Sequence, residues 1–235
     1  LMADVYGNGL LAYLAGDEYA TFVVECDMAE TEEWPVATFF RSYDDMPEVE
    51  RIALEHVEGA VLDVGAGAGS HALYLQRRVA EVTAIDISAG AVEVMRKRGV
   101  KRAFVQDFFE MEGEQFDTLL LMMNGIGIVG GLEGLPNFFK RAEKLLKPGG
   151  KILLDSSDLI YLYEDEDGEI YIDLNAPYYG ELEYVMSFGG RKGTPFKWLF
   201  VDFDTLSDYA AQNGFSCEKL YEDDHYLYLA ELRRR

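Results

Sequence analysis

Glycine and aspartate residues stand at spacings that suit the binding of a nucleoside. The run Gly65-Ala66-Gly67-Ala68-Gly69 follows an apolar stretch that ends with Asp63 and Val64. Glycines let the backbone approach a ligand closely, and the N-terminus of a helix after such a turn favours a negative group. Asp86 comes 21 residues after Gly65, which is about the 20 residues at which an acid reaches the two hydroxyls of a ribose. The pattern predicts a site for a nucleoside-bearing cofactor.

The glycine turn departs from the dinucleotide fingerprint, which needs glycine at its first, third and sixth places. Gly69 occupies the fifth place here, and Ser70 occupies the sixth. A pyrophosphate-containing ligand, and with it a nicotinamide-dependent oxidoreductase, is therefore disfavoured.

Apolar runs and helix patterns alternate along the chain and place this turn in a parallel sheet. Strands are predicted over residues 60–64, 81–85, 103–106, 116–123, 151–154, 216–221 and 226–232, and helices over 47–59, 71–79, 88–98, 136–146 and 204–213. Such alternation requires right-handed crossovers and helices on both faces. The tight join between the last two strands makes that pair antiparallel. We expect an α/β fold, with a Rossmann-like, doubly wound, mostly parallel seven-stranded sheet and a C-terminal antiparallel strand.

Two acidic segments lie outside the predicted sheet. The first 40 residues hold eight acids and no base, and their scattered apolar residues predict one or two amphipathic helices. We expect residues 1–45 to form an N-terminal helical lid and residues 46–235 to form the main domain. Ten acids and no base lie between Lys151 and Arg191. This stretch belongs to a predicted insertion at about 156–203, in which a loop precedes a β-hairpin of residues 182–188 and 196–201.

Five short motifs occur in order and resemble those of the class I S-adenosylmethionine-dependent methyltransferases. They read VLDVGAGAG (61–69), VTAIDIS (82–88), QDF (106–108), FDTLL (116–120) and LKPGG (146–150). The resemblance runs from about residue 47 to the C-terminus and includes the terminal antiparallel pair. It implies a methyltransferase domain over 46–235 and an enzyme that uses S-adenosyl-L-methionine and releases S-adenosyl-L-homocysteine.

The resemblance also implies roles for individual residues. Asp63 and the backbone at Gly65, Ala66, Gly67 and Gly69 would hold the methionyl moiety. Asp86 would accept from both ribose hydroxyls, Ile87 would pack on the adenine, and Asp107 would bind the adenine amino group with Phe108 alongside. Asn124 lies where many relatives keep a substrate-facing motif and is counted with the cofactor-binding residues. The alternative is structural: both acids would cap helices or turns, Phe108 would belong to the core, and the glycines after Asn124 would form a flexible loop.

Methyl transfer needs little from the protein beyond positioning, because the methyl carbon is already activated by its leaving group. His71, Asp155 and Asp158 are candidate general bases, but we assign no catalytic residue.

The acceptor is expected to be an unidentified small molecule. Tyrosines and carboxylates of the insertion (Tyr161, Tyr163, Tyr178, Tyr179 and Tyr184) could receive an amine through cation–π and charge contacts. The alternative is that the acids form a solvated surface.

The formal net charge of -22 disfavours DNA and anionic membranes as partners. Five bases between Arg96 and Arg102 suggest an RNA-binding strip, but cations at the end of a helix also complement its dipole, so RNA is disfavoured. Two cysteines and three histidines lack metal-ligand spacing, and few cysteines are typical of the cytoplasm. A non-catalytic S-adenosylmethionine-binding protein and an RNA or protein methyltransferase are the alternative functions. The oligomeric state is left open.

Overall fold

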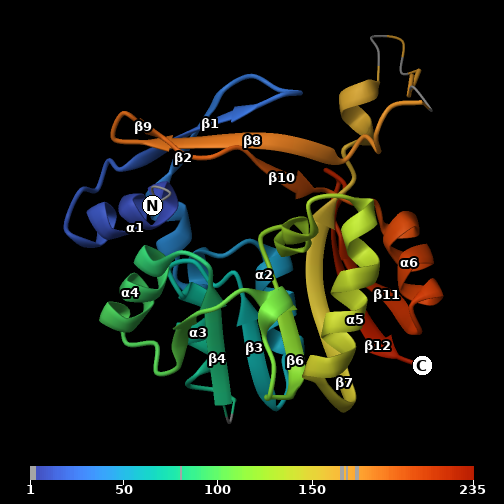
Figure 1. Ribbon diagram of the computed structural model, residues 1–235, viewed down its shortest axis with the longest axis horizontal. Helices are drawn as coiled ribbons and strands as arrows, with labels where there is room; N and C mark the ends of the chain where they lie inside the picture. Colours follow the sequence, from blue (N-terminus) through green and yellow to red (C-terminus); the bar gives the residue numbers. More distant parts are fainter. Residues whose placement is uncertain (1–3, 80, 165–166, 168, 173–174) are drawn as a thin grey trace.

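A computed structural model describes residues 4–79, 81–164, 167, 169–172 and 175–235. Two β-sheets organise these residues (Figure 1). A seven-stranded sheet, the main sheet, stands upright in the view, and a five-stranded sheet, the roof sheet, lies across its upper end.

The main sheet has the strand order β11-β12-β7-β6-β3-β4-β5. Its strands are β3 (Ala60–Val64), β4 (Glu81–Asp86), β5 (Ala103–Val105), β6 (Phe116–Leu121), β7 (Leu146–Ser157), β11 (Phe215–Glu222) and β12 (Leu227–Arg234). The pairs among β5, β4, β3, β6 and β7 are parallel, whereas β12 runs antiparallel to both β7 and β11. This confirms the predicted mostly parallel sheet. The strand order reverses at β3, so its carboxyl end is the point where ligands bind in folds of this kind.

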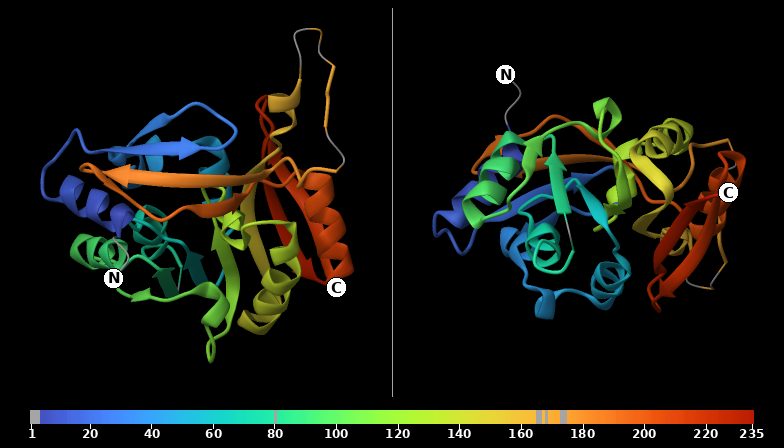
Figure 2. Two further views of the ribbon diagram at one scale, coloured as in Figure 1. Left: turned by 45° about the horizontal axis from the view of Figure 1, so that its top comes forward. Right: turned by 90° about the horizontal axis from the view of Figure 1, so that it is seen from below.

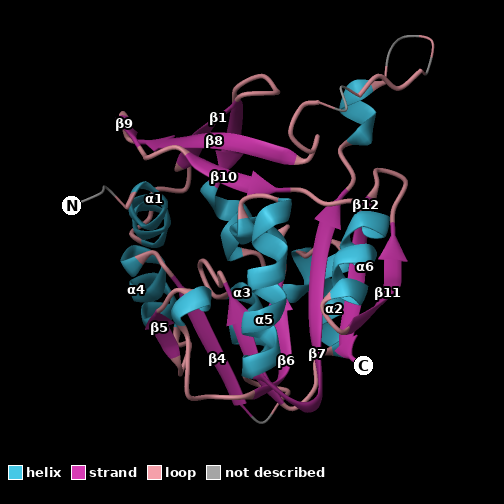
Figure 3. Ribbon diagram, turned by 45° about the vertical axis from the view of Figure 1, so that its right-hand side comes forward, coloured by secondary structure: helices cyan, strands magenta, loops and turns pink. Residues whose placement is uncertain are grey.

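Helices cover both faces of the main sheet (Figure 3). They are α2 (Glu48–His56), α3 (Ser70–Leu75), α4 (Ala89–Arg98), α5 (Leu135–Leu145) and α6 (Phe203–Gln212). One buried cluster joins α5 and α6 to one face, and a second joins α2, α3 and α4 to the other. Local capping explains the bounds of α4, because the Ser88 side chain accepts from the Ala91 N–H and Gly99 ends the helix at φ 97°. Helix α3 is shorter than predicted and ends at Leu75.

The roof sheet combines segments from two distant parts of the sequence. It has the order β10-β8-β1-β2, with β9 paired to β8. The strands are β1 (Thr21–Cys26), β2 (Glu32–Pro35), β8 (Glu181–Phe188), β9 (Arg191–Lys192) and β10 (Phe196–Leu199). The β1 and β8 segments lie side by side in both views of Figure 2 and pair antiparallel. The β-hairpin predicted in the insertion is thereby confirmed, with β10 paired to β8.

The N-terminal segment differs from the sequence-based expectation. One α-helix is present, α1 (Val5–Leu14), which is within the expected one or two; among described residues 4–40 a second α-helix is absent, because Thr21–Cys26 forms β1 and only the short 3₁₀ helix η1 (Val36–Phe40) follows. Phe22 and Val24 are buried and Val23 between them is exposed, as expected of a strand, and the strand is held by its pairing with β8. The lid was expected to span residues 1–45, of which residues 1–3 lie outside the described part. Residues 165, 166, 168, 173 and 174 of the acidic loop in the insertion lie outside it as well.

Candidate functional site

The first glycine of the turn borders open space at the carboxyl end of β3. Gly65, Gly67 and Gly69 adopt φ values of 66°, 55° and 80°, which glycine adopts without steric cost. A Cβ atom added to Gly65 would meet nothing within 4 Å. A Cβ atom on Gly69 would lie 2.8 Å from side-chain atoms of Met95 and Val100. The first glycine therefore borders open space, and the third allows close packing of the turn on α4.

Asp86 ties the glycine turn to the end of β4. Its Oδ2 accepts from the Gly67 N–H at 2.9 Å, and its Oδ1 accepts from the Ser88 N–H at 2.9 Å. Burial raises the pKa of this carboxyl, although the bonds from Ser88 and Gly67 act in the opposite direction. The structure thus brings Asp86 to the glycine turn, as predicted.

Asp63 lies beneath the same turn, and one of its two carboxylate oxygens has no hydrogen-bond partner. It is 1% exposed. Its Oδ2 is the one buried side-chain N or O atom among the described residues that has no hydrogen-bond partner. Burial raises the pKa of Asp63 to about 6, and the charge of His71 opposes that shift. A buried carboxylate oxygen without a donor is costly, so this atom is suited to receive a donor from a ligand.

His71 belongs to a buried ionic group and does not stand free in a cleft. Its Nε2 lies 2.7 Å from Oε2 of Glu50, and the other Glu50 oxygen accepts from Arg41. Burial disfavours the charged imidazole, but the Glu50 hydrogen bond and the charge of Asp63 outweigh it, and the pKa of His71 is raised. Glu50 and Arg41 were missed from the sequence, because neither stands near a recognised motif.

Asn124 joins the main sheet to the roof sheet. Its N–H donates to Oδ1 of Asp155 at 2.9 Å, and its side chain donates to the Leu199 carbonyl and accepts from the Ser156 hydroxyl. Met123 and Asn124 have φ values of 58° and 57°, a left-handed conformation that is strained for residues other than glycine. Strain of this kind persists only where the surroundings fix the backbone, and the three bonds do so here.

The short 3₁₀ helix η4 (Gly125–Val129) follows Asn124 and explains the glycines of this segment. A Cβ atom on Gly127 would lie 2.0 Å from Nε1 of Trp198. The same Nε1 donates to the Asn124 carbonyl at 3.1 Å. A flexible loop was the structural alternative for this segment. The segment is instead a 3₁₀ helix, and Gly127 gives the room in which the Trp198 ring of the roof sheet packs against it.

The residues predicted to contact adenine differ in exposure. The Ile87 side chain is 76% exposed at the end of β4, which leaves it free to pack on a ligand. Asp107 lies at the surface and caps the 3₁₀ helix η3 (Phe108–Glu110) by accepting from the Phe109 N–H at 2.8 Å. Phe108 is 3% exposed and packs against Phe138. The Phe108 side chain thus belongs to the core, and only its backbone is left for an adenine contact.

Helix α1 docks directly on the glycine turn, which the sequence did not reveal. Asp4 caps α1 by accepting from the Gly7 N–H, and the same carboxylate accepts from the Ser88 hydroxyl and the Gly90 N–H. A Cβ atom on Gly90 would lie 2.6 Å from Cα of Gly7, so the two helices touch through glycine. The hydroxyl of Tyr6 would lie 2.6 Å from a Cβ atom on Gly67. The one available signal was Asp4 itself, a residue type that begins helices.

The remaining candidates of the insertion are engaged in local structure. Tyr178 donates to Asp202 at 2.6 Å, and Tyr179 donates to Asp158 at 2.7 Å. These bonds anchor the base of the insertion. Tyr184 is part of β8 and lies apart from this group in the roof sheet.

The basic stretch at the end of α4 also makes structural contacts. Arg96 donates to the Ala103 carbonyl, Arg98 donates to the Ala68 carbonyl, and Lys97 pairs with Glu93. These contacts agree with the interpretation that the stretch stabilises the helix end.

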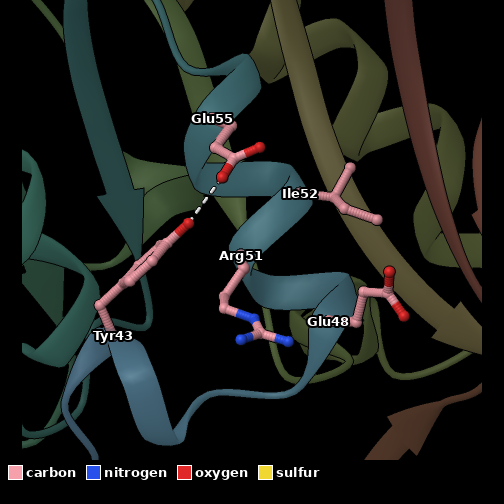
Figure 4. A pocket seen from close by; sticks show the side chains of 5 residues that line it. All are labelled: Tyr43, Glu48, Arg51, Ile52 and Glu55. Atoms are coloured by element: carbon pink, nitrogen blue, oxygen red, sulfur yellow. Dashed lines mark hydrogen bonds between the residues drawn. The ribbon is translucent and has the colours of Figure 1, made fainter.

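A surface hollow lies on the outer side of α2 and contains none of the predicted site residues. Figure 4 shows its lining residues, which are Tyr43, Glu48, Arg51, Ile52 and Glu55. The Tyr43 hydroxyl donates to Glu55 at 2.6 Å across it.

In the described part of the chain no group of three or more metal-binding side chains occurs, and no helix there has the length and apolar character to cross a membrane.

Comparison with known proteins places these features in a family. Residues 61–150 match the model of a family described as a methyltransferase domain. The crystal structure of an S-adenosylmethionine-dependent methyltransferase from Bacteroides fragilis, in complex with S-adenosyl-L-homocysteine, is similar at 46% identity and a TM-score of 0.92. That match covers 98% of this chain and 94% of the other.

Two curated relatives show more limited similarity. A ubiquinone biosynthesis O-methyltransferase from Xanthomonas oryzae is 34% identical over 107 residues, which are 41% of this chain and 42% of the relative. The biotin biosynthesis bifunctional protein BioHC from Saccharophagus degradans is 24% identical over 173 residues, or 71% of this chain and 28% of the relative. The chain thus spans less than half the length of these curated relatives.

Proposed function

The chain belongs to the S-adenosylmethionine-dependent methyltransferases, and from this premise we propose that it transfers a methyl group from S-adenosyl-L-methionine to a small-molecule acceptor. The observation that carries the proposal is the open space beside Gly65 together with the unpartnered Oδ2 of Asp63 at the same strand end. An amino-acid ligand brings an ammonium group that can donate to such an atom. The residues of the turn therefore fit the methionyl end of the cofactor.

The nucleoside end has matching residues. Asp86 stands at the end of β4 beside the turn, and Ile87 presents an exposed apolar surface next to it. We propose that Asp86 holds the ribose and that Ile87 packs on the base, with Asp107 and the backbone of Phe108 at the far edge. Asn124 is better explained as the residue that positions the roof sheet, because its polar groups have partners within the chain.

When bound, S-adenosyl-L-methionine supplies a methyl group that a sulfonium leaving group has already activated. The protein then contributes position and the exclusion of water, which together account for a large part of the rate in such reactions. Helix α1 and the roof sheet lie over the carboxyl end of the main sheet (Figure 1). We propose that residues 1–45 and the insertion at about 156–203 form the lid and shape the acceptor pocket.

The excess of acids supports a small molecule over a nucleic acid as the acceptor, since a net charge of -22 repels phosphate backbones. Cys26 and Cys217 are both free thiols, which supports a cytoplasmic location.

Calorimetry tests the cofactor, and product analysis tests the activity. We expect S-adenosyl-L-methionine and S-adenosyl-L-homocysteine to bind with one site per chain, and NAD not to bind. We also expect S-adenosyl-L-homocysteine to accumulate when acceptors are supplied. Binding of the cofactor without turnover on any acceptor would favour a non-catalytic binding protein, and tight NAD binding would overturn the proposal.

A further inference from the structure

Aromatic side chains gather on the face of the roof sheet that meets the main sheet. Trp34 of β2, Tyr184 of β8, and Phe196 and Trp198 of β10 lie on this face, because alternate residues of a strand share a side and paired residues face together. Phe200 extends the set just beyond β10. We call these five residues the aromatic cluster.

Tyr184 is the centre of the aromatic cluster. Its ring centroid lies 6.3 Å from Trp34, 6.0 Å from Phe196 and 6.4 Å from Phe200. Phe196 in turn lies 6.0 Å from Trp198. These separations are typical of rings that line a common surface.

The aromatic cluster is partly open. Phe22 on β1 is 0% exposed because it packs with Leu10 of α1, whereas Phe196 is 37% exposed. Trp34, Tyr184 and Trp198 have intermediate exposure. Helix α1 thus covers Phe22 at the centre of the sheet, whereas Phe196 on the edge strand β10 stays open to a ligand.

Trp198 places the aromatic cluster beside the predicted site of chemistry. Its ring rests on Gly127, and its Nε1 bonds to the Asn124 carbonyl just after the end of β6. Strand β6 neighbours β3 in the main sheet, so both strands end at the point where the strand order reverses. The cluster therefore faces the region in which the transferred methyl group is expected.

The charged side chain that bonds to the aromatic cluster is a carboxylate. Glu32 pairs in register with Val24 and shares the inner face, and its Oε2 accepts from Nε1 of Trp34 at 2.7 Å. Burial, followed by the charges of Cys26 and Glu32, raises the pKa of the Tyr184 hydroxyl. Within strands β1, β2, β8 and β10, all of them described, the single base is Lys197, which alternates with the rings and so lies on the outer face. In β9, Arg191 pairs with Phe188 and shares the inner face, four residues along β8 from Tyr184. Aromatic faces and a carboxylate attract a cation.

We propose that the aromatic cluster and Glu32 form the acceptor site and that the acceptor is an amine; the inference rests on the methyltransferase function proposed above. An amine that binds as an ammonium ion first releases one proton to water, and its nitrogen then uses the freed lone pair to form the new bond to the methyl carbon, while the carbon–sulfur bond breaks and its electron pair goes to sulfur. Positive charge passes from sulfur to nitrogen, and a proton on the nitrogen leaves to water. The rings and Glu32 stabilise that charge as it develops on nitrogen, whereas an anionic oxygen acceptor would be repelled.

The two tryptophans of the chain, Trp34 and Trp198, both belong to the aromatic cluster, so intrinsic fluorescence reports on it directly. The probe is benzyltrimethylammonium, compared with benzyl alcohol and phenylacetate, each titrated into the full chain with S-adenosyl-L-homocysteine present. We expect the cation to change the fluorescence at the lowest concentration and phenylacetate at the highest. Equal or tighter binding of the alcohol or the anion would overturn the proposal.

Matched variants locate the binding. Glu32→Gln should weaken the cation about fivefold, at the upper end of the range for an exposed charge contact. Glu33→Gln is the control, because Glu33 pairs with Val23 and faces outward. An equal effect of both substitutions would refute a role for the inner face.

A parallel calorimetric titration with S-adenosyl-L-homocysteine separates two failures. If that ligand binds and the cation does not, the acceptor site is refuted while the methyltransferase function stands. If the cation binds and that ligand does not, the proposed function fails instead. Methylation of amines, and not of matched phenols, would extend the binding result to turnover.

Discussion

The ionised carboxylate of Asp63 should destabilise the protein when no cofactor is bound, and Asp63→Asn should relieve that destabilisation. The pKa of Asp63 is raised from 3.8 to about 6 because the side chain is buried, at 1% exposure. The shift corresponds to about 3 kcal/mol once the group is ionised in both the folded and the unfolded chain.

The direction in which stability changes with pH follows from proton binding by Asp63. Because the folded pKa is the higher one, the folded chain holds the Asp63 proton more tightly than the unfolded chain does. Stability from this group is full below the unfolded pKa of 3.8 and is lost as the pH rises to about 6. Asparagine stays neutral, but its amide would leave an unpaired donor in place of Oδ2, which costs about 1 kcal/mol or more. We expect a net gain of about 1 to 2 kcal/mol for the variant near neutral pH, or roughly 2 to 8 °C in Tm.

Urea unfolding of the cofactor-free chain measures this gain at about pH 7.5 and again at about pH 5, where it should shrink. Calorimetry on the same variant should show at least about tenfold weaker binding of S-adenosyl-L-methionine, since a charged hydrogen bond is lost. A variant that is less stable than the natural chain at neutral pH, or a difference that does not change with pH, would refute the reasoning.

Three further substitutions test other contacts. Asp4→Ala should destabilise the protein by about 1 to 2 kcal/mol in urea unfolding, because one carboxylate caps α1 and holds α4. Gly127→Ala should cost about 1 to 3 kcal/mol and shift the tryptophan emission, because the added Cβ atom meets Trp198 at 2.0 Å. Asp86→Asn should weaken the cofactor about tenfold or more in calorimetry, because its carboxylate positions the glycine turn.

Asp4→Ala has a matched control, and each prediction has an outcome that would contradict it. Asp17→Ala removes an exposed acid close to the end of α1 and should leave the stability within about 0.5 kcal/mol. An equal loss in both variants would show that Asp4 acts only through net charge. Unchanged emission in Gly127→Ala would contradict the contact with Trp198. Unchanged cofactor affinity in Asp86→Asn, with the fold intact, would remove Asp86 from the site.

Local patterns predicted the part of the fold that local forces determine. The glycine turn, the acid at the end of β4 and the capping of α4 by Ser88 all depend on residues close in sequence. They could be recognised because a positive φ, a strand end and a helix cap each favour particular residue types.

The same patterns could not predict which strands and side chains, distant in the sequence, contact one another. Thr21–Cys26 reads equally as part of an amphipathic helix, and its pairing with β8 decides in favour of a strand. The partners of Asn124, which include Leu199 and Ser156, could not be inferred because they lie on distant strands. Phe108 follows the motif position but fills the core beside α5, where packing decides its orientation.

The roof sheet also has a consequence for how the chain is made. Val23 pairs with Ser187, so at synthesis rates of 5 to 20 residues per second β1 waits roughly 8 to 30 s for its partner. During that time β1 and β2 expose an unpaired edge, which is a template for association with other chains. Glu25, Glu32 and Glu33 place negative charge on this hairpin. The acidity of the N-terminal segment therefore also protects the nascent chain from aggregation, before any ligand is bound.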